Sequence, residues 1–231
     1  MGLDHSPNIV TDGLVFIIDS ANTRSYSGSG NTIYDLRSGT ACTFWGGSGF
    51  SSSNAGMFYL NGSNAIRIED SSILRPAVLT IASWCRFNAF DAFDTIVSKA
   101  QNGPSWGPPY LSYMIRIENN GTSINYALGD GSYRSSTYSY SFATNTHYHL
   151  VMTYDGATLK GYINGINVIS TPLVITISYA ALPVLISGSY GSVPFGETIN
   201  GNISEVQFYN RALSAQEIVQ NYNATKRRYG L

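Results

Sequence analysis

The chain has 231 residues, 13 of them basic and 14 acidic, so its formal net charge is -1. Charged residues make up only 12% of the chain, against roughly 25% in average soluble proteins. This mixed, near-neutral charge excludes an electrostatic attraction to nucleic acid or to acidic membrane lipids. The length suits one domain with a filled core, and we expect residues 1–12 to form an N-terminal arm and residues 13–231 a single domain.

Short stretches of alternating apolar and polar residues, separated by turn-forming pairs, indicate an all-β protein. In chain order, the expected strands cover residues 14–19, 57–60, 65–69, 79–87, 95–100, 110–118, 147–154, 158–163, 166–170, 184–188 and 202–210. Asn-Gly or Asp-Gly pairs at 61–62, 155–156 and 164–165 predict three hairpins, because these pairs accept the positive φ of tight turns. Together the strands suffice for two packed sheets.

The strand over 147–154 should turn one apolar face toward the core. That face carries Tyr148, Leu150, Met152 and Tyr154. One helix is predicted at the C-terminal end, where Ser214 and Glu217 form a capping box and the apolar residues recur at helical spacing. It should end near Arg228, where cations meet the helix dipole favourably.

Residues 201–214 read GNISEVQFYNRALS, and Glu217-Ile218 follow shortly after. This segment resembles the closing signature G-x-I-D-E-V-x-I-Y-N-R-A-L-S-x-x-E-I of laminin-G-like jelly rolls in the concanavalin A-like lectin and glucanase superfamily. The strand at 79–87 and the hairpin at 148–165 are similar to two further stretches of that family. The resemblance implies a two-sheet antiparallel jelly-roll sandwich with one short C-terminal helix. Ser204 stands where the family often has Asp, so no carboxylate role is implied there.

Residues 5–39 also look like the opening of laminin-G-like structural proteins of tailed phages. This likeness implies a virion protein, assembled in the host cytoplasm and needing no signal peptide. Consistent with that, the N-terminus lacks an apolar signal region and no stretch is apolar enough to span a membrane. We expect a virion location, with an extracellular surface as the alternative. The expected partners are glycans or other virion proteins, including further copies of the chain, and exclude nucleic acid and membranes.

The carboxylates show no catalytic pair along the sequence. Retaining glycosidases need two carboxyl groups roughly 5 Å apart. Glu69 and Asp70 are adjacent and face opposite sides of a strand, while Asp91 and Asp94 fall in an expected loop. The E-x-D-x-x-E pattern of the superfamily's glucanases is absent. We therefore expect no enzyme activity, although a pair assembled from distant strands stays open.

Metal binding is weighed at two kinds of position. His147 and His149 share a strand face, but no neighbouring ligand completes a shell, so ordinary packing or surface exposure is expected. The resemblance implies a loop-borne Ca²⁺ in many relatives, and Asp130 and Asp155 each precede a glycine in a turn where carbonyls could join the carboxylate. Both aspartates are equally well explained as turn formers. Cys42 and Cys85 fit no zinc or disulfide pattern and are expected to be free thiols.

Aromatic residues in Gly- and Ser-rich segments are the best binding candidates. Their rings can stack on sugars, because loops at the edges of a sandwich carry function on a rigid scaffold. The candidates are Trp106, Tyr133, Tyr190 and Phe195, with Tyr138 and Tyr140 nearby in sequence. The same rings could instead close the core or contact a neighbouring subunit.

The leading functional hypothesis is a non-enzymatic phage virion surface protein, acting in capsid decoration, as a fibre or in adhesion, with glycan binding as its activity. A soluble or cell-surface lectin module is the first alternative. A glycoside hydrolase is the second, and it would require two carboxylates brought together by folding.

Overall fold

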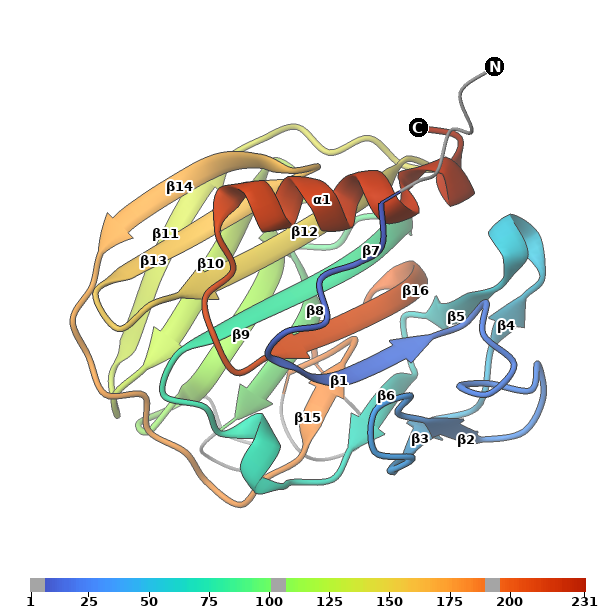
Figure 1. Ribbon diagram of the computed structural model, residues 1–231, viewed down its shortest axis with the longest axis horizontal. Helices are drawn as coiled ribbons and strands as arrows, with labels where there is room; N and C mark the ends of the chain where they lie inside the picture. The colour runs from blue at the N-terminus through green and yellow to red at the C-terminus, as the bar shows by residue number, and fades with distance from the viewer. Residues whose placement is uncertain (1–6, 101–106, 190–195) are drawn as a thin grey trace.

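The computed structural model describes residues 7–100, 107–189 and 196–231, which form two antiparallel β-sheets lying face to face (Figure 1). Sheet A runs in the order β14 (Ile166–Pro172), β13 (Thr158–Ile163), β12 (His147–Tyr154), β7 (Leu79–Ala89), β16 (Asn200–Tyr209), β5 (Met57–Asn61) and β4 (Phe50–Ser51), with β1 (Leu14–Asp19) also on β16. Sheet B runs β11 (Tyr133–Ser139), β10 (Ser123–Gly129), β9 (Leu111–Glu118), β8 (Phe93–Ala100), β15 (Val184–Ile186), β6 (Ala65–Ile68), β3 (Ala41–Trp45) and β2 (Thr32–Tyr34). The predicted all-β sandwich is confirmed.

The helical segments are short and lie mostly at the C-terminal end. They are η1 (Ser53–Ala55), η2 (Ser72–Leu74), α1 (Ala215–Thr225) and η3 (Lys226–Tyr229). Helix α1 crosses the outer face of sheet A (Figure 1). The predicted capping box at Ser214 and Glu217 is present. Within the described residues, no helix is long and apolar enough to cross a membrane.

The core between the sheets follows the alternation predicted for β12. Its four predicted inward residues are all buried, and they are Tyr148, Leu150, Met152 and Tyr154. Gly161 on β13 is required by the close approach of a large ring, since a Cβ there would lie 2.3 Å from Cε2 of Tyr126. The Tyr126 hydroxyl donates to the Tyr162 carbonyl at 3.1 Å, so this buried phenol is satisfied.

Two of the three predicted hairpins are confirmed and one is wrong. The Asp155-Gly156 turn joins β12 to β13, and the Asn164-Gly165 turn joins β13 to β14 with φ angles of 52° and 81°. Asn61-Gly62 instead carries the chain from β5 in sheet A to β6 in sheet B. Both strands alternate apolar residues into the same core, so the sequence pattern cannot distinguish a hairpin from a crossing between sheets.

Strands β10 and β11 were not expected from the sequence. Strand β10 is buried along its whole length, which removes the alternation that marks a half-buried strand. Strand β11 is a mostly exposed edge strand rich in Ser and Tyr. As a result, Tyr133 and Tyr138 belong to a regular strand rather than to the loop in which their Ser-rich surroundings placed them.

Strand β16 is buried on both faces and is the hub of sheet A. Its whole length pairs with β7 on one side, while β5 and β1 share the other side. Ile203, Val206 and Phe208 belong to the core. Among the polar side chains of the strand, Glu205 and Gln207 are buried on the outer face of the sheet.

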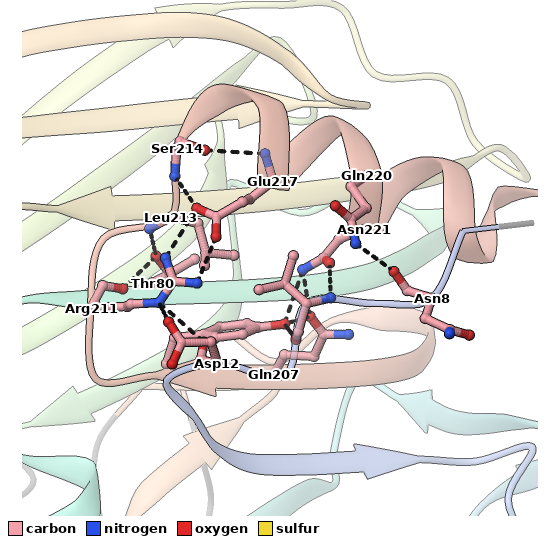
Figure 2. A network of polar contacts seen from close by, with 12 residues as sticks. Asn8, Asp12, Thr80, Gln207, Arg211, Leu213, Ser214, Glu217, Gln220 and Asn221 are labelled. Carbon is pink, nitrogen blue, oxygen red and sulfur yellow. Dashed lines mark hydrogen bonds and ion pairs between the residues drawn. The ribbon is translucent and has the colours of Figure 1, made fainter.

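A polar network joins this outer face to α1 (Figure 2). The Asn221 amide donates to Gln207 Oε1 at 3.3 Å and to the Tyr209 hydroxyl at 2.9 Å, while its Oδ1 accepts from the Val10 N–H at 2.8 Å. The described part of the expected N-terminal arm is thereby held against the helix. At the start of α1, the Arg211 guanidinium binds the Glu217 carboxylate at 2.6 and 3.0 Å.

Replacing Asn221 with Ala should destabilise the fold strongly, because the buried Val10 N–H loses its side-chain partner and Gln207 and Tyr209 each lose one of theirs. We expect a loss of about 2–3 kcal/mol in the free energy of unfolding, measured by chemical denaturation. The matched control is Gln216→Ala on the exposed side of the same helix, which should change stability by less than about 0.5 kcal/mol. Equal losses in both variants would contradict a locking role for the network.

Candidate ligand-binding site

The aromatic residues predicted to bind ligand fall into two groups. Trp106, Tyr190 and Phe195 lie outside the described residues. Tyr133 is half-buried at the start of β11, its hydroxyl donating to Asn125 Oδ1 at 2.8 Å and its ring centroid 6.2 Å from that of Tyr110. Tyr133, the one ligand-binding candidate of the four that the structure describes, is therefore anchored on the outer face of sheet B.

The two aspartates considered for calcium are held by nitrogen donors. Asp130 accepts from the Ser132 N–H at 3.0 Å and pairs with Arg134 at 3.3 Å. Oδ1 of Asp155 accepts from the N–H groups of Ala157 and Thr158. No group of three His, Cys, Asp or Glu side chains suited to a metal occurs in the described segments. These contacts do not fit a calcium site, because a hard cation needs several free oxygen ligands, and calcium binding stays an untested prediction.

The two histidines of β12 pack beneath the C-terminal segment, as expected. His149 is buried with its ring centroid 5.1 Å from that of Trp84 and 6.1 Å from that of Tyr222. Burial lowers the pKa of His149 to about 3. The ring is thus neutral at physiological pH and acts as a packing group. Both cysteines are free and buried, as predicted.

Folding does bring two distant carboxylates to one cation on sheet B. The Arg116 guanidinium on β9 contacts Glu118 on the same strand, and its Nη1 lies 3.1 and 3.2 Å from the carboxylate oxygens of Glu197. Arg116 also lies 4.5 Å from the Phe93 ring centroid. The guanidinium stands between the two acids, where a retaining glycosidase would need room for a sugar.

Next to this cluster, an exposed aromatic ring lines a polar pocket. The pocket has a volume of about 350 Å³ and is lined by Gly62, Asp91, Ala92, Phe93, Glu197 and Thr198, and we call it the Phe93 pocket. Phe93 is 42% exposed at the start of β8. An apolar ring beside acceptor carboxylates matches the two sides of a sugar, one formed by C–H groups and the other by hydroxyls. The volume is within the range of small-ligand sites.

A buried acid lies beside Phe93 in the sequence. Asp94 is fully buried, its Oδ2 accepts from the Asp91 N–H at 3.0 Å, and its Oδ1 has no hydrogen-bond partner among the described residues. Burial raises the pKa of Asp94 to about 7. The sequence placed Asp94 in a loop, whereas it belongs to β8.

Two further pockets involve strands of sheet A, and the second of them lies between β14 and Tyr138 on β11 of sheet B. One, of about 320 Å³, is lined by Tyr59 and Arg86 among other polar residues. The other, of about 220 Å³, includes Tyr138, Tyr140 and Ile166. Tyr138 and Tyr140, two of the aromatic residues singled out from the sequence, both line this second pocket.

The residues of the Phe93 pocket carried little signal in the sequence. Asp91 was noted only as an unpaired acid, and Phe93 and Glu197 were not considered. The pocket is assembled from segments that are far apart in the chain, around residues 62, 93 and 197. A short motif cannot reveal it, although an apolar ring flanked by aspartates in the run FDAFD was a usable hint.

Comparison with known proteins settles the family. The family model described as concanavalin A-like lectin/glucanases superfamily matches residues 60–219, which is more than half of the chain. The chain belongs to this superfamily. None of the curated protein sequences matches it. Since the match includes β16 and the first five residues of α1, it covers Gln207, Arg211 and Glu217 of the network in Figure 2, whereas Asn221 lies beyond the matched residues of this concanavalin A-like chain.

Solved structures with the same fold come from several kinds of protein. The chain aligns with domain 4 of AbnA, a GH43 extracellular arabinanase from Geobacillus stearothermophilus in complex with arabinotriose, at 16% identity and a TM-score of 0.70, covering 90% of this chain and 98% of that one. It aligns with the receptor binding domain of botulinum neurotoxin type G at 18% identity and a TM-score of 0.66, covering 91% and 51%. It aligns with Trypanosoma rangeli sialidase in complex with sialic acid at 12% identity and a TM-score of 0.69, covering 95% of this chain and 34% of that one. The chain thus spans about half of the toxin domain and a third of the sialidase, and these likenesses show the fold.

The buried Glu205 of this concanavalin A-like domain should make stability depend on pH. Burial, and secondly Asp19, raise the pKa of Glu205 to about 8, while Arg228 opposes the shift. In the unfolded chain a glutamate loses its proton near pH 4.3. The unfolded state therefore binds fewer protons than the folded state between these two values, and stability falls as pH rises through this window.

Glu205→Gln should remove this contribution to the pH slope. We compare the melting temperature of the variant with that of the wild type at each pH. We expect the difference, variant minus wild type, to grow by roughly 5 °C or more between about pH 5 and pH 9. Glu69→Gln, at an exposed carboxylate, is the control and should leave the slope unchanged. Parallel curves for wild type and Glu205→Gln would show that Glu205 does not titrate in this window.

Proposed function

We propose that this protein is a non-enzymatic carbohydrate-binding module that uses the Phe93 pocket. One observation carries the proposal, the exposed Phe93 ring beside the carboxylates of Asp91 and Glu197. A sugar stacks its C–H face on such a ring while its hydroxyls donate to carboxylate oxygens. Arg116 and the Thr95 hydroxyl, 2.9 Å from Glu197 Oε2, hold that carboxylate in place before a ligand arrives.

The structural neighbours support the same class of ligand. Among them, the arabinanase domain is described in complex with arabinotriose, and a botulinum neurotoxin type C structure concerns two ganglioside molecules. Their sequence identity to this chain is 16% and 15%, so they support the fold and leave the site to be tested.

We further propose that the module is displayed on a phage-like particle, in capsid decoration, in a fibre or in adhesion. Support comes from the likeness of residues 5–39 to laminin-G-like structural proteins of tailed phages. A soluble or cell-surface lectin module is the alternative, and it would use the same pocket. Cross-linking of assembled particles that contain this chain would identify its virion neighbours, and absence of the chain from purified particles would favour the alternative.

A glycan array probed with the purified chain tests sugar binding, once with calcium and once with EDTA. We expect specific binding that Phe93→Ala weakens roughly tenfold, because loss of an aromatic stacking surface costs about 1.4 kcal/mol. Tyr34→Ala is the matched control, since Tyr34 is 48% exposed on β2 and is not among the residues lining the pocket. The calcium arm tests the ion separately.

Three outcomes would overturn parts of this proposal. A silent array under both conditions would leave only a structural role. Binding that survives in Phe93→Ala would move the site elsewhere. Release of reducing ends from a bound glycan would show a hydrolase and would direct attention to Glu118 and Glu197 around Arg116.

A further inference from the structure

A second pocket opens on the outer face of sheet A, over residues of β5, β7 and β16. The lining residues include Tyr59, Arg86, Asn88 and Asn202, and the volume is about 320 Å³. Tyr59, Asn202 and Arg86 are direct cross-strand neighbours on β5, β16 and β7. Their positions are therefore fixed by the central part of the sheet. We call this the Arg86 pocket.

The positive charge of Arg86 is bound only by neutral groups among the described residues. Its Nη1 donates to Asn88 Oδ1 at 2.8 Å and to Asn202 Oδ1 at 3.3 Å, and its Nη2 donates to Asn145 Oδ1. Within the described segments no carboxylate pairs with it. By contrast, six other arginines each pair with an acid, namely Arg67, Arg75, Arg116, Arg134, Arg211 and Arg228.

None of the described residues that line the pocket is acidic, and the charge nearby is positive. The neighbouring His147 is kept neutral, since burial, followed by the fields of Arg86 and Arg228, lowers its pKa to about 4. Arg228 itself is neutralised by Asp19 at 2.7 Å. Arg86 thus contributes an uncompensated positive charge to a partly enclosed space, which attracts an anion.

The guanidinium also has donors to spare. An arginine carries five N–H donors, and the three hydrogen bonds that Arg86 makes to described side chains use three of them, which leaves two for a ligand. Three asparagines hold the group in place, so little side-chain entropy remains to be lost on binding. A carboxylate is the anion whose two oxygens match a pair of guanidinium N–H groups.

We propose that the Arg86 pocket binds the carboxylate of an acidic sugar. Tyr59, 40% exposed, offers a ring for stacking, and the side chains of Asn54 and Ser53 offer partners for sugar hydroxyls. The proposal shares with the proposed function only the ligand class, glycans. It concerns a different site, with different residues and a different charge, so either can fail without the other.

Calorimetric titration of the full chain with monosaccharide probes tests it. The acidic probe is the methyl glycoside of galacturonic acid, which keeps its free carboxylate. The neutral probe is methyl galactoside. We expect the acidic probe to bind at least tenfold more tightly than the neutral one, and Arg86→Gln to abolish this preference. Arg67→Gln, at a half-buried arginine paired with Glu69, is the matched control and should keep this preference.

Further measurements keep the result interpretable. The melting temperature of Arg86→Gln checks folding, and Tyr59→Ala, which leaves the guanidinium in place, should weaken the acidic probe severalfold. Phe93→Ala should leave the acidic probe unaffected. Equal binding of both probes, or a preference that survives Arg86→Gln, would overturn the proposal. Inorganic phosphate or acetate binding as tightly as the acidic sugar would overturn the sugar part.

Discussion

A strand buried on both faces can carry polar side chains only if each finds a hydrogen-bond partner, and β16 meets this constraint through α1. Gln207 and Tyr209 point away from the core into a space that the helix closes, and Asn221 supplies their partner. The neighbouring strands β7, β5 and β1 all pair with β16. In this chain, Arg211 and Glu217 thus fix the start of the helix, while Gln207, Tyr209 and Asn221 hold the helix against the strand.

Much of this architecture could be predicted from the chain alone. Alternation identified β1, β7 and β12, and the Ser214 capping box located the helix, because these signals depend on local geometry. The predictions failed where the local sequence pattern does not determine the tertiary arrangement. Asn61-Gly62 makes a turn in either case, but which sheet receives the next strand depends on contacts with β15 and β3.

The candidate sites were less predictable for a related reason. A ring such as Phe93 becomes a binding surface only because residues around 62 and 197 leave it exposed beside carboxylates. The role of Arg86 could not be predicted from the sequence either, because its neutral surroundings come from Asn202 on β16 and from Asn145 in a loop, both far from it in the chain. Aromatic binding residues were expected in Gly- and Ser-rich segments, whereas Phe93 lies at the start of β8 and Arg86 within β7.

The crossing from β5 to β6 has one more consequence. Tyr59 lines the Arg86 pocket and Gly62 lines the Phe93 pocket, so three residues of chain, spanning at most about 11 Å, connect the two. Asn202 and Thr198 repeat this proximity at the start of β16. A polymer whose acidic and neutral units are spaced to match the two pockets would engage both at once, and its second contact would form at a high effective concentration. The domain would then respond to the order of sugars along a chain more strongly than to any single sugar.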